Sequence, residues 1–329
     1  MAIQSMEKPS RPFKQVIIWG HKLHTHTHSY IHFAFKRAFE ALGYPTYWFD
    51  NNDNVRNFDF SNSLFLTEGQ VDQKIPLRSD CRYILHYCRD FSKYKKLYDQ
   101  GNCILLAVYR YDNPEAGGRH YLMTAPQCEK VDRWTYIDVP EKIIYMPWAT
   151  DLLPNEIDLV KEKIKSVKKE KAVHVVASID GGGKENPFEN LSKYAPFRQA
   201  CEGNGIAFYN HKYLSMEENI DVTQRSLIAS ALQSQIQCDI GYIPCRIFKN
   251  ISYGQFGSTN SKEVWELFDR KIVYNPDTYQ LFYDTVNKVQ HMDISELYEL
   301  MDYVRDNHTY INRIERILWF MNKIKPFNT

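Results

Sequence analysis

The chain has 329 residues, 43% of them apolar and 25% charged, and its 41 Lys and Arg side chains nearly balance 40 Asp and Glu. This length fits two domains of roughly 150 residues each. The charge balance argues against nucleic acid or a membrane surface as a partner, because such partners usually go with an excess of basic residues. We expect a small-molecule partner and no nucleic acid.

The cysteines and the apolar stretches indicate the compartment. The seven cysteines form no CxxC pair and are odd in number, which argues against a disulfide framework or a zinc knuckle. Residues 1–14 are polar, and no stretch approaches the ~18 apolar residues of a membrane span. We expect a cytoplasmic protein without a membrane span.

The first half alternates short apolar runs with amphipathic stretches. The pattern predicts a strand at 15–20, a helix at 30–42 that ends at Gly43, and a strand at 46–49. Further strands are predicted at 63–66, 82–86, 103–108, 134–138 and 142–146. Alternation of strand and helix predicts a parallel sheet with crossover helices.

The pattern starts again after a charge-rich stretch at 151–171, whose mixed Lys and Glu are typical of a solvated helix face or a linker. Strands are predicted at 172–177, 206–209 and 239–243, and helices near 194–202, at 221–235, and at 276–289, 295–305 and 309–323. Two α/β halves follow, which we assign to domains 1–150 and 151–329.

Ligands of such sheets bind beyond the carboxyl ends of the strands, so the loops there are the candidate sites. The loop after the first strand carries histidines at 21, 24, 26 and 28. Alternating His24, His26 and His28 would share one face of an extended segment and could hold zinc, but no carboxylate or cysteine lies nearby in sequence. Contacts to an acceptor or phosphate, a general base, and simple turn or capping residues are the other interpretations.

Two loops of the second half could bind a diphosphate. Three glycines and Lys184 at 180–184 would let backbone N–H groups approach an anion, although a plain flexible turn explains them equally. In the second segment, 244–274, a helix ends at Gly254, a short strand ends in Ser-Thr-Asn260, and the next helix exposes its first N–H groups.

The stretch 239–274 resembles the donor-site signature of GT-B glycosyltransferases, and is closest to the CgeB-like group and the group 1 glycosyltransferases. Residues 306–313, with His308, Thr309, Tyr310 and Arg313, are similar to the start of the terminal helix in that group, and 145–151 resembles the end of its N-terminal domain. The resemblance implies two Rossmann-like domains facing across a cleft, with the C-terminal helices packing back on the N-terminal domain.

The resemblance also implies a metal-independent glycosyltransferase that moves a sugar from a nucleoside-diphosphate sugar to a hydroxyl of a glycan or small-molecule acceptor, without a cofactor. A departure is Lys249, which stands where the family commonly has a ribose-binding Glu. A cation cannot accept hydrogen bonds from ribose, so Lys249 is predicted to face a phosphate or sugar carboxylate.

The residues predicted to bind the donor are Gly182, Lys184, Arg246, Lys249, Asn250, Tyr253, Gly254, Ser258, Thr259 and Asn260. An inverting enzyme also needs a base, for which His26, His28 and Asp90 are the candidates. Structural alternatives stay open, since Arg246 could form only a salt bridge and Asp90 could only cap a helix. The alternative function is a non-catalytic two-lobed sugar- or nucleotide-binding protein.

Overall fold

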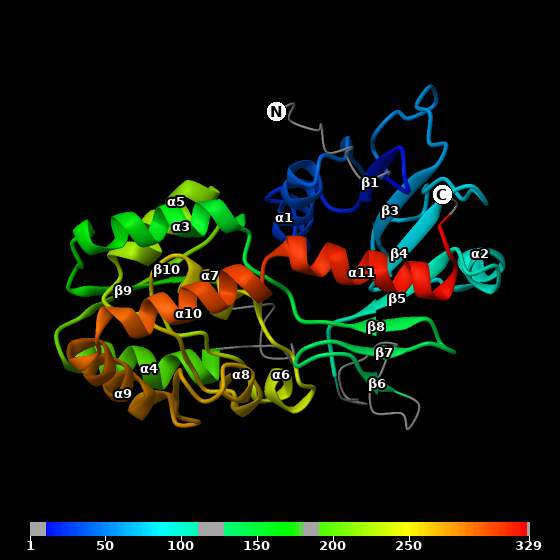
Figure 1. The fold of residues 1–329 in the computed structure, drawn as a ribbon. Coiled ribbons are helices and arrows are strands. Elements are labelled where there is room, and N and C mark those ends of the chain that lie inside the picture. Colours follow the sequence, from blue (N-terminus) through cyan, green and yellow to red (C-terminus); the bar gives the residue numbers. More distant parts are fainter. Residues whose placement is uncertain (1–10, 111–127, 178, 180–190, 328–329) are drawn as a thin grey trace, which may run out of the picture. The chain divides into compact units, whose positions relative to one another are not determined.

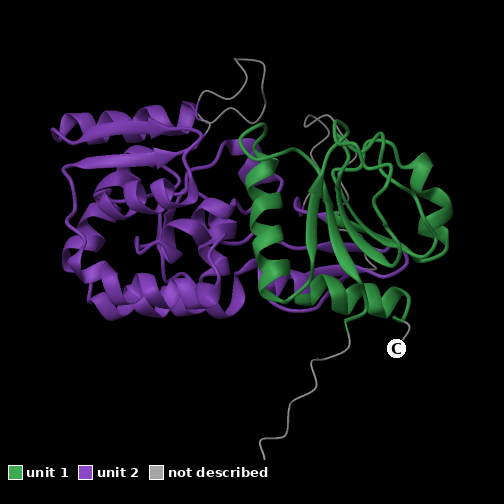
Figure 2. Cartoon of the chain, turned by 90° about the horizontal axis from the view of Figure 1, so that it is seen from above, with its two compact units in different colours: residues 1–106, 315–329 green, residues 107–314 purple. Residues whose placement is uncertain are grey.

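The chain divides into two compact units, residues 1–106 with 315–329 and residues 107–314 (Figure 2). The structure, a computed structural model, describes residues 11–110, 128–177, 179 and 191–327. Each unit combines helices with parallel strands, so the predicted α/β class is confirmed.

The first unit is built on five parallel strands in the order β2-β1-β3-β4-β5 (Figure 1). The strands are β1 (Gln15–Trp19), β2 (Thr46–Phe49), β3 (Ser63–Glu68), β4 (Arg82–His86) and β5 (Cys103–Ala107). All residues of β1, β3, β4 and β5 are buried, as expected of parallel strands covered on both faces. The other elements are α1 (His28–Ala41), the 3-10 turn η1 (Ser92–Tyr94) and α2 (Lys95–Asp99).

Helix α1 ends where the sequence predicts. Gly43 has φ +83°, its N–H donates to the Glu40 carbonyl (2.8 Å), and the Tyr44 N–H donates to the Phe39 carbonyl (2.9 Å). A glycine adopts this left-handed conformation without strain, which closes the last turn of the helix.

The C-terminal end of the chain belongs to the first unit. Arg82 of β4 donates hydrogen bonds to the carbonyls of Lys325 and Pro326 (3.2 Å each), and Phe327 packs edge-on against Phe13 at 5.1 Å between ring centroids. The last helix therefore returns to the N-terminal part, as the resemblance implied.

The second unit contains two parallel strand pairs, β9-β10 and β11-β12, and three antiparallel strands, β6, β7 and β8. Its strands are β6 (Glu129–Lys130), β7 (Tyr136–Asp138), β8 (Ile143–Tyr145), β9 (Ala172–Val176), β10 (Ala207–His211), β11 (Ser258–Thr259) and β12 (Val273–Tyr274). Its helices are α3 (Pro154–Lys163), η3 (Ile164–Ser166), α4 (Leu191–Gly203), α5 (Met216–Arg225), α6 (Gln235–Asp239), α7 (Cys245–Ser252), α8 (Lys262–Leu267), α9 (Thr278–His291) and α10 (Ile294–Asn307), while α11 (Tyr310–Ile324) continues into the first unit.

An extended segment links the two parallel pairs. The Leu227 N–H donates to the Ala172 carbonyl of β9 (2.8 Å), and the Ala231 N–H donates to the Ser258 carbonyl of β11 (2.9 Å). The segment therefore runs from β9 to β11, where Ala231 forms an isolated parallel bridge with Thr259, and the sequence pattern did not predict it.

Two predicted elements were wrong. The predicted helix 221–235 is replaced by α5, which starts earlier because Ser215 caps it, and by the extended segment just described. The predicted strand 239–243 is the end of α6, capped by Ser234, and a turn in which Gly241 has φ +63°. The predicted strands 134–138 and 142–146 are confirmed as β7 and β8, but they pair with each other as an antiparallel hairpin.

The compact units do not coincide with the predicted domains 1–150 and 151–329. Residues 107–150 group with the second unit, and residues 315–329 group with the first. The predicted boundary near residue 150 stays a prediction.

A buried arginine joins distant segments of the second unit. The Arg313 guanidinium, 1% exposed, donates to the carbonyls of Pro147 (2.7 Å), Trp148 (2.9 Å) and Asn307 (2.9 Å) and contacts Nδ1 of His308 (2.9 Å). Burial lowers the pKa of Arg313 to about 9, so the side chain is still charged at neutral pH. These bonds give His308 and Arg313, both in the 306–313 stretch, a structural role in this chain.

Within the described residues, no helix is both long and apolar enough to cross a bilayer.

We predict that His308 makes the stability depend on pH. Burial, together with nearby Arg313, holds the pKa of His308 well below 6.5, so the folded ring stays neutral while the unfolded ring takes up a proton below about pH 6.5. Stability is then lost as the pH falls from 7 to 5, by up to about 1.4 kcal/mol per pH unit from this group.

The test is chemical denaturation of the wild type and of His308→Asn, whose amide oxygen can still accept from Arg313, at several pH values. The variant should show the shallower dependence of the unfolding free energy on pH. Parallel curves would contradict the prediction.

Candidate functional site

The segment predicted to bind the donor has the expected layout in the second unit. Helix α7 ends in a Schellman motif, in which the Gly254 N–H donates to the Ile251 carbonyl (2.9 Å) and the Gln255 N–H donates to the Asn250 carbonyl (2.9 Å). Gly254 has φ +92°, and a Cβ there would overlap the side chain of Ile164. Strand β11 and helix α8, capped by Ser261, follow.

Arg246, on the first turn of α7, bonds to the wall of a pocket. It donates from one guanidinium nitrogen to the hydroxyl of Tyr194 (2.7 Å) and to the carbonyl of Leu232 (3.0 Å). Burial raises the pKa of Tyr194, and Arg246 acts in the opposite direction. The salt bridge considered for Arg246 is replaced by these two neutral acceptors, so its charge is not cancelled by them.

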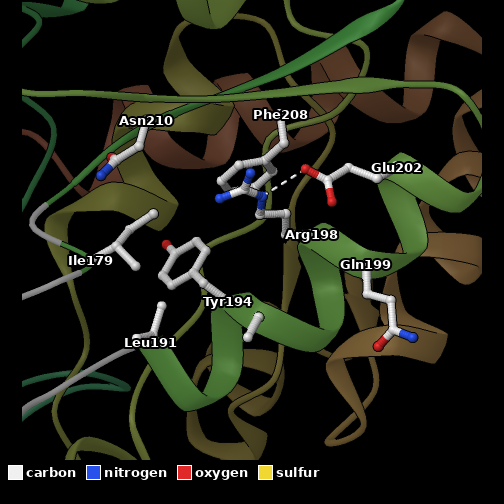
Figure 3. Close-up of a pocket in the computed structure, with 9 residues that line it drawn as sticks. Ile179, Leu191, Tyr194, Arg198, Gln199, Glu202, Phe208 and Asn210 are labelled. Carbon is white, nitrogen blue, oxygen red and sulfur yellow. Dashed lines mark hydrogen bonds and ion pairs between the residues drawn. The ribbon is translucent and has the colours of Figure 1, made fainter.

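The pocket has a volume of about 320 Å³ and lies between α4 and β10 (Figure 3). Figure 3 shows the rings of Tyr194 and Phe208 at its wall, with Ile179 beside Tyr194 and the Arg198–Glu202 pair beside Phe208. Its lining residues are Ile179, Leu191, Tyr194, Ala195, Arg198, Gln199, Glu202, Phe208 and Asn210. Aromatic rings with a few amide and charged groups are typical of small-ligand pockets.

Lys249 lies in a nearly buried ion pair. Its ammonium group is 2.7 Å from the Asp151 carboxylate, and the two side chains are 15% and 10% exposed. The Tyr253 hydroxyl donates to the other oxygen of Asp151 (2.6 Å). Asp151, which the sequence analysis placed in a motif but not in the site, is thus the partner of two predicted donor-site residues, and a donor anion would have to share Lys249 with it.

Four other predicted donor-site residues form hydrogen bonds within the protein. The Asn250 amide donates to the Ala229 carbonyl (2.9 Å), and Ser258 pairs with Ser230 (2.7 Å). Thr259 donates to the Ala231 carbonyl (3.1 Å), while the Asn260 side chain bonds both to the N–H and to the carbonyl of Gln233 (2.9 Å each). All four side chains are less than 10% exposed. Gly182 and Lys184 lie outside the described residues.

In the first unit, His26 and His28 gather around a buried carboxylate that the sequence analysis missed. Glu68 is the last residue of β3, which pairs with β1 in parallel, so the loop after β1 lies beside it. His28 Nδ1 is 3.3 Å from one carboxylate oxygen of Glu68 and His21 Nε2 is 3.6 Å from the other. The His21 and His26 rings stack at 4.4 Å between centroids. The sequence signal for Glu68 is its position as a charged residue at the end of an apolar strand.

The electrostatics of this cluster favour a neutral His26 ring and an ionised Glu68 carboxylate. Burial, and then His28, lower the pKa of His26 to about 4. Burial acts to raise the pKa of Glu68, but the imidazoles of His28, His32 and His21 outweigh it and lower that pKa. His26 is therefore neutral at neutral pH, and its lowered pKa makes it a weaker base than an ordinary histidine.

Asp90 caps the turn that follows it. Its carboxylate accepts from the N–H (3.1 Å) and the hydroxyl (2.5 Å) of Ser92, at the start of η1. The bond with Ser92 lowers the pKa of this exposed carboxylate, which makes Asp90 a weaker base than an ordinary aspartate.

We predict that Lys249→Met lowers the free energy of unfolding by about 3–5 kcal/mol, because it leaves the Asp151 charge buried without its partner. Adding Asp151→Asn should recover part of this loss, since the uncompensated charge is then gone. Denaturation of both variants measures the difference.

Lys262→Met, at a lysine that is 69% exposed, is the matched control and should change stability by less than about 0.5 kcal/mol. Equal stability of Lys249→Met and the control would show that the ion pair contributes nothing.

Comparison with known proteins gives structural similarities only. No protein-family model matches the chain, and no curated protein is significantly similar to it. A glycosyltransferase from Rickettsia africae ESF-5 aligns over 95% of this chain and 98% of its own, with 10% identity and a TM-score of 0.43. The apo structure of OtsA aligns over 92% and 78% (10%, 0.40), and the N-terminal domain of trehalose-6-phosphate phosphatase from Candida albicans over 81% and 72% (10%, 0.40). Similarity at this level transfers no residue role or activity to this chain.

Proposed function

We propose that this chain is a GT-B type glycosyltransferase that moves a sugar from a nucleoside-diphosphate sugar to a hydroxyl of a glycan or small-molecule acceptor. The observation that carries the proposal is the donor-type segment of the second unit, in which Arg246 of α7 bonds to the wall of a ligand-sized pocket. The sequence resemblance of 239–274 to GT-B donor sites supports it independently of the pocket.

The pocket suits the nucleoside part of the donor. The partly exposed ring of Phe208 can contact a base, and the amides of Gln199 and Asn210 can exchange hydrogen bonds with its edge, while the buried ring of Tyr194 supports the wall. A volume of about 320 Å³ is at the lower end for ligand pockets, which suits part of a ligand.

Arg246 is proposed to stabilise the leaving diphosphate. In the reaction, the acceptor oxygen bonds to the anomeric carbon while the bond from that carbon to the diphosphate oxygen breaks, so negative charge develops on the diphosphate. A guanidinium favours that charge and binds two phosphate oxygens at once. This assignment requires no metal ion at the diphosphate.

The acceptor proton requires a base if the reaction inverts the anomeric centre, and His26, His28 and Asp90 remain the proposed candidates. The lowered pKa values of His26 and Asp90 make both of them weaker bases than an ordinary histidine and aspartate.

The test is a thermal-shift screen of UDP-, GDP-, ADP-, dTDP- and CMP-sugars, followed by an assay for release of the nucleotide. One nucleotide class should raise the melting temperature, because a ligand that binds the folded state stabilises it. Arg246→Ala should weaken its binding by about ten- to a hundred-fold, the usual effect of losing a charged hydrogen bond. Phe208→Ala should also weaken it, and Arg305→Ala, on a different helix, is the matched arginine control.

Binding without turnover would favour the alternative, a non-catalytic two-lobed sugar- or nucleotide-binding protein. The transferase proposal fails if no sugar nucleotide binds, or if Arg246→Ala binds as tightly as Arg305→Ala.

A further inference from the structure

Four buried polar atoms at one end of the first unit's sheet have no hydrogen-bond partner among the described residues. They are both carboxylate oxygens of Glu68, Nε2 of His21 and Nδ1 of His28. The Glu68 side chain is fully buried, and its contacts at 3.3 and 3.6 Å to the two histidines are not aligned as hydrogen bonds. A buried carboxylate is normally hydrogen-bonded or bound to a metal ion, because desolvation without compensation is costly.

Two of these residues, His21 and Glu68, lie together with His26 at separations close to those of a metal site. One ligand atom each from His21, His26 and Glu68 lies within 4.8 Å of the other two. Ligands about 2.1 Å from a tetrahedral ion are about 3.4 Å apart, so movements of about an ångström would complete the set. Two of the three residues are in a loop, where such movements disturb little packing.

We propose that His21, His26 and Glu68 bind one divalent transition-metal ion, with zinc as the best fit. Two imidazoles and one carboxylate form a three-residue set known from zinc enzymes, and they leave a fourth position for water or a substrate oxygen. Imidazole ligands disfavour Mg²⁺ and Ca²⁺, which prefer oxygen. His28, 3.3 Å from Glu68, is placed to hold the carboxylate oxygen that the ion does not use.

The surroundings of the site fix the loop that carries the histidines. Nδ1 of His32 is 3.4 Å from the His21 carbonyl, and the His32 ring packs so closely on Gly20 that a Cβ at Gly20 would overlap it. His21 is therefore positioned by other residues before any ion binds. His26 Nδ1 accepts from the His28 N–H (3.2 Å), and this bond has to break when either ring nitrogen of His26 binds the ion.

This site lies wholly in the first unit and does not depend on the proposed glycosyl transfer. If the ion is bound, His26 is a ligand and not a free base, which leaves His28 and Asp90 as candidates for that role.

The experiment uses the full chain without a histidine tag, freed of metal with EDTA and titrated separately with Zn²⁺, Fe²⁺ and Mg²⁺ by calorimetry and thermal shift. We expect one Zn²⁺ per chain, a higher melting temperature with Zn²⁺, and no response to Mg²⁺. His26→Ala and Glu68→Gln should each weaken Zn²⁺ binding by at least about 100-fold, the upper end of the loss seen for outer-shell partners.

His24→Asn is the matched control, because His24 is an exposed histidine of the same loop outside the three-ligand set and asparagine tolerates its φ of +67°. Circular dichroism of the metal-free variants checks that they fold, and His21→Ala replaces any ligand variant that does not. The proposal is overturned if Zn²⁺ does not bind, or if it binds the ligand variants as tightly as the wild type. Selective Fe²⁺ binding lost in the same variants would keep the site and overturn the choice of zinc.

The metal titrations need no sugar nucleotide, and the donor screen can be run on metal-free protein. Failure of one proposal can therefore be told apart from failure of the other.

Discussion

The second unit depends most on one buried cation. Arg313 is charged and almost fully buried, yet its guanidinium bonds to three backbone carbonyls and an imidazole. Segments 165 residues apart in the chain are held by this one side chain. A guanidinium suits the position because it has five donors fixed in one plane, whereas an ammonium group has three on a compact centre.

Buried polar side chains also bond to the backbone in the predicted donor segment. Asn250, Thr259 and Asn260 all bond to backbone groups of the extended segment between β9 and β11 or its flanks. Residues that look like ligand contacts in a motif can therefore be required for the fold around the ligand instead. Arg246 and the pocket beside Tyr194 are the parts of this region with groups left to offer a donor.

Apolar runs and helix-ending glycines in the sequence predicted several elements at the correct residues. Strand β4 lies at the predicted residues 82–86, and α1 ends at Gly43 because a glycine at that position has a clear physical role. The stretch 239–243 looks like a strand by composition, but the Ser234 cap and Gly241 decide for a helix and a turn. The extended segment 227–231 was not predicted, because the residues on either side of it favour a helix.

Site residues were harder to predict because their partners are distant in sequence. The sequence has no carboxylate near the histidine loop. Glu68 lies beside the loop only because β1 pairs with β3. The sequence predicts that Lys249 faces a phosphate. In the structure its ion-pair partner is Asp151, 98 residues earlier in the chain. Such contacts are set by strand order and helix packing, which single-sequence patterns do not contain.

The division of the chain has a consequence for how the protein is made. The second unit is inserted within the first, whose strand β4 bonds to residues 243 and 244 positions later. Contacts this far apart in sequence slow folding. During synthesis the inserted unit can fold first. The first unit is completed only after residues 315–329, which follow the second unit in the chain, have been synthesised.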